Sequence, residues 1–214
     1  MDPLFFLLIL PFLIYWCINE KTGLQIGIVV LLCIWAIFLY RNFVEYLPFN
    51  FDLEWVIIAV IFCGYLFLRS RIESLLLKGG FRACMTVTAA VSFLMIIYRP
   101  ELEFVLPGGL LLGLGIGYCL NRRFIGFKSM NVLERTGLAK YLTLLARFVL
   151  GMAVLVLFVF RIELIIEQIS KSQNIFLYGF LCYALISMWV SVASPWVFIK
   201  LRLAGSSSGI EEKQ

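Results

Sequence analysis

The amino-acid sequence predicts an all-α, polytopic transmembrane helical bundle of about seven spans. Two features of composition indicate this class: 63% of the 214 residues are hydrophobic and only 14% are charged, whereas ordinary soluble domains carry roughly 25% charged residues. The third observation is that the apolar residues gather into seven stretches between polar loops. We expect residues 1–204 to form a single transmembrane domain. Residues 205–214, GSSSGIEEKQ, are small, polar and without periodicity, which predicts a disordered cytoplasmic tail.

The seven apolar stretches are the candidate spans. In chain order they are Leu4–Ile18, Leu24–Tyr40, Trp55–Leu68, Ala83–Tyr98, Phe104–Leu120, Tyr141–Phe160 and Ile175–Lys200. Several are shorter than the roughly 20 residues that cross a hydrocarbon core of about 30 Å, so we expect their ends to extend into the loops. The first stretch lacks the basic start and small-residue cleavage site of a secretory signal, which predicts a retained span. Pro11 and Pro195 can be accommodated as kinks within a bundle.

The fifth stretch is the one around which we expect the other helices to pack. Gly109, Gly113 and Gly117 recur every four residues and therefore share one face of a helix. Helix association in lipid depends on van der Waals fit, so a stripe of small residues predicts a site of close helix packing. A merely flexible apolar helix is the alternative. A nucleotide-binding loop is excluded because no strand precedes these glycines and no Lys-Ser or Lys-Thr follows them.

The positions of lysine and arginine predict the topology. If all seven stretches cross, thirteen of the eighteen cations lie on one side and four on the other, with Arg147 inside the sixth span. The positive-inside rule then places the N-terminus outside and the C-terminus inside. We expect Arg147 either to reach the inner interface or to face the bundle, against a backbone carbonyl or an acid such as Glu134. The net charge of +5 is spread over loops, which excludes a nucleic-acid-binding face.

Cysteine and histidine usage restricts the chemistry. The six cysteines are Cys17, Cys33, Cys63, Cys84, Cys119 and Cys182. They form no close pairs and lie in or beside apolar stretches, so we expect them to be small buried hydrophobic residues. The sequence contains no histidine, which excludes a His-based triad, a His general base and a His metal site. We therefore expect no cofactor and no metal site.

Three segments carry a resemblance to a known family: FFLLILPFLIYWCINEKTGLQIGIVVLLCIW, VLPGGLLLGLGIGYCLNRRFIGF and FLCYALISMWVSVASPWVFIKLRLA. They resemble a bacterial branch of the type 2 phosphatidic acid phosphatase superfamily that carries extra C-terminal helices. The resemblance implies a six-helix core plus those helices, in the bacterial cytoplasmic membrane, with catalytic loops at its outer surface. It also implies phosphate-binding Lys and Arg, a Pro-Ser-Gly-His proton donor and a nucleophilic His assisted by Arg and Asp.

The chain departs from this pattern at the catalytic positions. Where the family has a Lys followed six residues later by Arg-Pro-Phe, residues 40–49 read YRNFVEYLPF and keep only the proline and phenylalanine. The proton-donor position reads DLEW at residues 52–55, and the nucleophile region reads YRPELEFVLPGG at residues 98–109. We infer that the phosphohistidine mechanism cannot operate, and we predict no catalytic residue.

Arg41 and Arg99 are the candidate lipid-phosphate-binding residues. They lie in outward loops at two family motif positions and together could clamp a lipid phosphate. The alternative is that each arginine extends from a span end to the interface. The acids on the same side could pair with these arginines, bind a divalent cation or lie in a solvated loop. They are Glu45, Asp52, Glu54, Glu101 and Glu103.

These observations support three hypotheses of different classes. The first is a non-catalytic membrane protein that binds phospholipid or polyprenyl-phosphate head groups, or that acts as a membrane scaffold. The second is a lipid phosphate phosphatase, a phosphoric monoester hydrolase, with residual or unrecognised activity. The third is a small lipid or solute transporter, which the lack of a convincing internal repeat disfavours. The expected partners are membrane lipids, including lipid phosphates; a membrane-protein partner or a second copy of the chain is left open.

Overall fold

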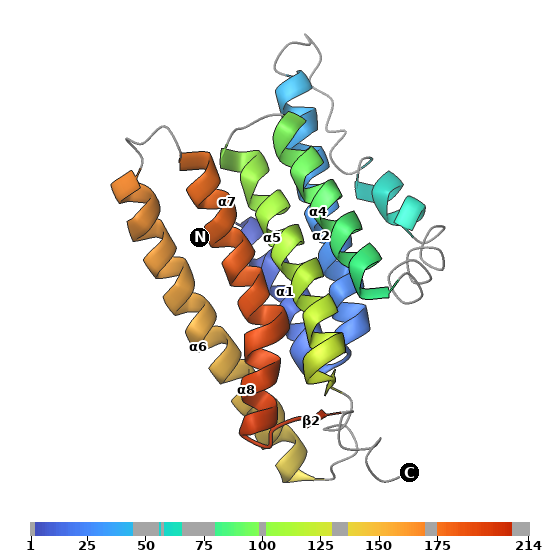
Figure 1. The fold of residues 1–214 in the computed structure, drawn as a ribbon, viewed down its shortest axis with the longest axis vertical. Coiled ribbons are helices and arrows are strands. Elements are labelled where there is room, and N and C mark those ends of the chain that lie inside the picture. The colour runs from blue at the N-terminus through green and yellow to red at the C-terminus, as the bar shows by residue number, and fades with distance from the viewer. Residues whose placement is uncertain are drawn as a thin grey trace.

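The computed structural model is a bundle of long helices (Figure 1). It describes residues 3–44, 56, 58–65, 80–98, 102–129, 137–169 and 175–206. The α-helices are α1 (Pro3–Cys17), α2 (Glu20–Val44), α4 (Gly80–Tyr98), α5 (Leu102–Leu120), α6 (Leu138–Ile169), α7 (Ile175–Met188) and α8 (Ser194–Lys200). Two π-helical segments, η1 (Asn121–Ile125) and η3 (Trp189–Ala193), continue α5 and α7, and strands β1 (Phe127–Lys128) and β2 (Gly205–Ser206) pair antiparallel.

The predicted all-α transmembrane class is confirmed. Six of the seven predicted stretches lie in these helices. Four helical segments of the described chain are long and apolar enough to cross a membrane: Glu20–Asn42, Phe104–Ile125, Leu138–Phe158 and Phe176–Lys200. Phe81–Ile97 is apolar but shorter. The last predicted stretch is a single span made of α7, η3 and α8, and the proline within it, Pro195, stands in the first turn of α8.

Helix α5 lies at the centre of the bundle, between α4 and α7, with α6 on the far side of α7 (Figure 1). Thr88 and Ser92 of α4 approach Gly115 and Gly108 of α5, in that order, so these two helices are antiparallel. Helices α2 and α5 are also antiparallel, because Gly27 of α2 lies beside Leu114 of α5 whereas Phe38 of α2 packs on Phe104 of α5. Helices α2 and α4 are therefore parallel to one another. The C-terminal end of α2 and the N-terminal end of α4 therefore lie at opposite ends of the bundle.

The third predicted stretch, Trp55–Leu68, is described only in part. Residue 56 and residues 58–65 are helical. Two large apolar side chains of this helix, Val60 and Phe62, are 65% and 51% exposed. The remaining residues of the stretch lie outside the described residues.

Local sequence signals explain where two of the helices begin and end. The side chain of Asn19 caps α2, because its Oδ1 accepts the backbone N–H groups of Lys21 (2.9 Å) and Thr22 (3.3 Å). The acidic Glu20 follows in the first turn, where the helix dipole favours a negative charge. Gly126 ends η1 in the left-handed conformation (φ 62°), and its N–H donates to the carbonyl of Asn121.

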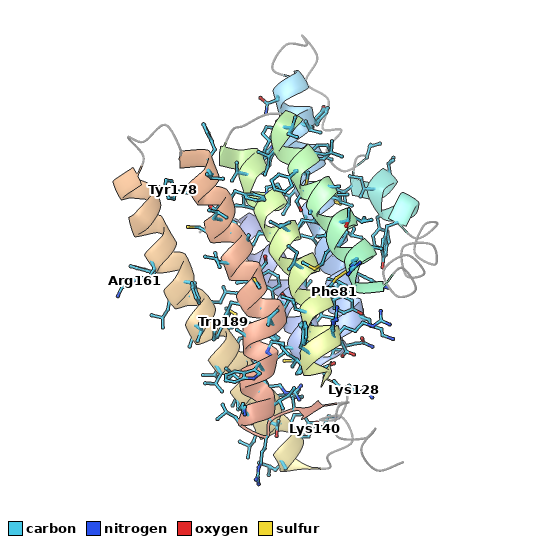
Figure 2. The ribbon with its side chains drawn as sticks, in the orientation of Figure 1. Phe81, Lys128, Lys140, Arg161, Tyr178 and Trp189 are labelled. Carbon is cyan, nitrogen blue, oxygen red and sulfur yellow. A yellow bond between two sulfur atoms is a disulfide. The ribbon has the colours of Figure 1, made fainter. Side chains whose placement is uncertain are left out.

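Cys33, Cys84 and Cys119 are buried as expected, whereas Cys17 and Cys182 are half-buried. The sequence did not predict that two of the buried cysteines are joined. Cys84 of α4 and Cys119 of α5 form a disulfide, with 6.7 Å between their Cα atoms (Figure 2), and Cys63 is exposed. Cys84 and Cys119 are separated by 35 residues and meet only because α4 and α5 are antiparallel. Connectivity of this kind cannot be deduced from sequence.

We expect maleimide labelling of the denatured, unreduced protein to modify four cysteines and leave Cys84 and Cys119 unmodified. The reason is that a disulfide sulfur is not a nucleophile, whereas the thiolate of a free cysteine is. Mass spectrometry after proteolysis should recover the two residues in one linked peptide pair. A Cys182→Ser variant is the control and should keep that pair. Labelling of all six cysteines before reduction would contradict the assignment.

The tail predicted to be disordered, residues 205–214, begins with two residues that form a strand. Gly205 and Ser206 form β2, which pairs with Lys128 and Phe127 of β1. This pairing uses backbone groups, so the small polar side chains that predict disorder do not prevent it. Residues 207–214 lie outside the described residues.

Candidate functional site

The two arginines predicted to bind lipid phosphate are not brought together by the described residues. Arg41 stands in the last turn of α2 and its side chain is exposed. Arg99 lies outside the described residues, one position beyond α4. The C-terminal ends of α2 and α4 lie at the same end of the bundle (Figure 1). The phosphate clamp therefore stays a prediction.

The three glycines of the predicted packing stripe face α7 and η3. A Cβ atom added to Gly109 would lie 2.7 Å from the carbonyl oxygen of Phe180. At Gly113 it would meet the carbonyl oxygen of Ala184, and at Gly117 the hydroxyl of Ser191. Contacts this close leave no room for any side chain. The backbone of α5 thus lies directly against α7 and η3.

The most elaborate polar site lies at the opposite end of the bundle from Arg41. We call this end the basic end, because Lys21, Arg122, Arg123 and Lys128 lie there. At its centre is Arg147 of α6, whose side chain is completely buried. Its guanidinium also lies 5.5 Å from the ring centre of Phe127.

Arg147 binds three backbone carbonyls from three distant segments. Nε and Nη2 donate to the carbonyl oxygen of Leu203 at 3.1 and 2.7 Å. Nη1 donates to the carbonyl oxygens of Trp16 at 2.8 Å and Ser129 at 3.4 Å. This arrangement matches one of the alternatives expected from the sequence, a buried arginine against backbone carbonyls. A guanidinium suits the task because it offers five N–H donors in a fixed plane.

Two of the carbonyls that accept hydrogen bonds from Arg147 lie at helix ends, and the third lies in a loop. Trp16 is in the last turn of α1, and the final carbonyls of a helix have no partner further along it. Leu203 follows α8, whose end is closed by the Leu203 N–H donating to the carbonyl of Phe198 at 2.8 Å. Arg202 adopts a left-handed φ of 56° in that turn. One cation therefore satisfies backbone groups left over by two helix ends and a loop.

A second network connects α1 to the two π-helical segments. The indole Nε1 of Trp16 donates to the carbonyl of Val190 at 2.9 Å, and the Tyr15 hydroxyl donates to that of Ser191 at 3.2 Å. Asn121 of η1 donates to the Tyr15 hydroxyl at 2.7 Å and accepts the N–H of Phe127 at 3.2 Å. The two π-helical segments are thus bridged through one buried tyrosine.

Beside this network is a polar cavity of about 160 Å³. Its charged lining residues are Glu20, Lys21, Arg122 and Lys128. Glu20 accepts hydrogen bonds from the hydroxyl of Ser129 (2.7 Å) and from its N–H (3.3 Å). The three cations therefore face the cavity with one carboxylate that already has protein partners.

The basic end offers cations and hydrogen-bonding groups. Among the described residues, no three Cys, Asp or Glu side chains gather as a metal site would require, and the full sequence has no histidine. Sequence reasoning foresaw the environment of Arg147 but missed the polar cavity. One signal for this cavity was available in the sequence of α2. Lys21 lies about one turn before the apolar Leu24 and two turns before Ile28, on the same helix face.

One comparison with known proteins finds a relative of this chain. Residues 105–206 match a family model described as PAP2 superfamily phosphatase, transmembrane extension. No curated protein and no solved structure matches the chain. The matched range begins in α5 and ends at β2, so it contains the three glycines, both π-helical segments and Arg147. This match supports the resemblance to the type 2 phosphatidic acid phosphatase superfamily: residues 105–206 of this integral membrane protein are similar to the transmembrane extension of the PAP2 superfamily phosphatases.

Proposed function

We propose that this chain is a non-catalytic membrane protein that binds the phosphate head groups of phospholipids or polyprenyl phosphates. The observation that carries the proposal is the combination of a match to a phosphatase family with a sequence of 214 residues that contains no histidine. The family's mechanism, as the resemblance implies, needs histidine both as nucleophile and as proton donor. Recognition of a phosphate needs only cations and hydrogen-bond donors. Binding can therefore persist where that mechanism cannot operate.

The proposed outer binding residues are Arg41 and Arg99. Arg41 is exposed at the end of α2, and α4, whose last residue Tyr98 precedes Arg99 in the sequence, ends at the same end of the bundle. Two guanidinium groups at one interface would supply planar, charged donors to a phosphate.

We expect the purified protein in detergent to release no inorganic phosphate from phosphatidic acid or from undecaprenyl pyrophosphate. Binding of the same lipids should weaken about thirtyfold in the Arg41→Ala/Arg99→Ala variant, since each cation near the membrane surface contributes about 1 kcal/mol. The control is Arg161→Ala, which removes an exposed cation at neither motif position. Turnover that disappears in the double variant would instead support a histidine-free phosphatase. Unchanged binding would remove the two arginines from the proposal.

A membrane scaffold is the second candidate function. Its support is Arg147, which joins α1, α6 and the chain after α8 through hydrogen bonds to backbone carbonyls. Such bonds hold the basic end in one arrangement whatever lipid surrounds it. The scaffold role predicts a protein that binds neither lipid phosphate nor substrate, and that is recovered from membranes together with a partner.

A further inference from the structure

We propose that the basic end holds one anionic phospholipid, with its phosphate in the polar cavity and an acyl chain in an apolar cleft between α2, α4 and α5. This site is separate from the outer arginines. Arg41 lines neither the polar cavity nor the cleft, and Arg99 lies outside the described residues.

The charge of the polar cavity favours a phosphate. Among the described residues that line it, Lys21, Arg122 and Lys128 supply three positive charges and Glu20 supplies one negative charge. The carboxylate of Glu20 accepts two hydrogen bonds from Ser129, so part of its accepting capacity is used within the protein. All three cationic side chains are exposed. A phosphodiester that enters the cavity would meet an excess of positive charge.

An apolar cleft of about 230 Å³ lies beside the polar cavity. Its wall includes Leu24 and Ile28 of α2, Val87 and Val91 of α4, and Leu111 of α5. Tyr118 lines both the cleft and the polar cavity. One molecule with a charged end and an apolar end would therefore fill the two spaces together.

Along one face of α2, a cationic residue is followed by apolar residues. Lys21, Leu24, Ile28 and Leu32 are spaced by three or four residues and so occupy one face. Lys21 lines the polar cavity, whereas the other three line the cleft. At 1.5 Å per residue this face runs about 16 Å along the helix. One leaflet of a hydrocarbon core of about 30 Å is about 15 Å deep, so the site has the length of one leaflet.

The central helix repeats the same order. Arg122 follows Tyr118 by four residues, and Gly115 and Leu111 lie further along the same face of α5. Arg122 lines the polar cavity, and Gly115 and Leu111 line the cleft. Two antiparallel helices thus each present a cation at the interface and apolar residues beyond it. A free phosphate would leave the cleft without an occupant, whereas a phospholipid uses both parts.

The chain's own third helix is the other possible occupant of the cleft. Its Val60 and Phe62 side chains are more than half exposed, so they do not fill an apolar space in this structure. The proposal therefore commits to a lipid.

The test is native mass spectrometry of the full-length protein in a mild detergent with palmitoyl-oleoyl phosphatidylglycerol. We expect one retained lipid per chain, and about thirtyfold weaker retention by the Lys21→Ala/Arg122→Ala variant. Phosphatidylcholine with the same acyl chains should bind more weakly than phosphatidylglycerol. A second variant, Val87→Trp, adds bulk to the cleft without changing charge and should also weaken retention.

Matched variants separate this site from a general attraction of lipid to positive charge. Lys140→Ala/Lys200→Ala removes two cations from the same end, outside the polar cavity, and should retain the lipid as the wild type does; Figure 2 shows Lys140 and Lys128 at that end. Arg41→Ala/Arg99→Ala should also retain it, which distinguishes failure here from failure of the outer site. Equal loss of bound lipid by Lys21→Ala/Arg122→Ala and by Lys140→Ala/Lys200→Ala would overturn the proposal. So would inorganic phosphate that displaces the lipid at equal concentration, full retention by Val87→Trp, or a disulfide formed between Cys63 and a cysteine introduced at Val87.

Discussion

The Arg147→Met variant is expected to unfold at a midpoint temperature about 6 °C or more below that of the wild-type protein. Methionine keeps much of the apolar volume but removes four N–H···O hydrogen bonds to the carbonyls of Leu203, Trp16 and Ser129. Hydrogen bonds to charged groups contribute about 1.5–3 kcal/mol each. If only two of the four bonds contribute, each at the lower value, the variant loses about 3 kcal/mol of stability. For a chain of this size that loss lowers the unfolding midpoint by about 6–12 °C.

The measurement is thermal unfolding in detergent followed by circular dichroism. Arg147→Lys should be intermediate, because an ammonium retains the charge but cannot reach three carbonyls in the plane of a guanidinium. Arg161→Met is the matched control, since Arg161 lies on the same helix with an exposed side chain (Figure 2). It should change the midpoint little. Equal midpoints for Arg147→Met and Arg161→Met would show that the buried arginine does not hold the basic end together.

Helix positions were predictable because each depends on information within one segment. An apolar stretch long enough to approach a membrane's thickness becomes a helix whatever the rest of the chain does, since backbone groups in lipid must be satisfied locally. Residues 175–200 illustrate this, because they form one span even though η3 interrupts the α-helical hydrogen bonding. The four-residue spacing of the α5 glycines likewise defines a face from local sequence alone.

What joins the helices was not predictable, because it depends on which helix ends meet. Nothing in residues 138–169 indicates that the acceptors of Arg147 are Trp16 and Leu203, which are 131 and 56 residues away. The Cys84–Cys119 disulfide has the same origin: each cysteine reads as one more small apolar residue in its own helix. The polar cavity combines residues of α2 with residues at and after the end of α5, so the position of Lys21 on α2 is a signal that does not by itself define the cavity.

Substitution of Gly113 by alanine is expected to separate α5 from α7 and to lower the unfolding midpoint by several degrees. The new Cβ would meet the carbonyl oxygen of Ala184 and the hydroxyl of Ser187. A backbone carbonyl cannot rotate away as a side chain can, so the helices must move apart and lose contacts along the interface. Overpacking of this kind costs about 1–3 kcal/mol, and in lipid the lost van der Waals fit is what holds the helices together.

Two further variants test whether close packing is the cause. Gly64→Ala changes the same residue type where no atom lies within 4 Å of the added Cβ, so it should leave the midpoint unchanged or raise it slightly. Gly117→Ala meets the hydroxyl of Ser191, which is a side-chain atom, and a second substitution, Ser191→Ala, should recover part of the loss. No equivalent side-chain substitution at Ala184 should rescue Gly113→Ala, because the obstacle there is backbone. If Gly113→Ala and Gly64→Ala unfold at the same temperature, the glycine stripe is not what holds α5 against α7.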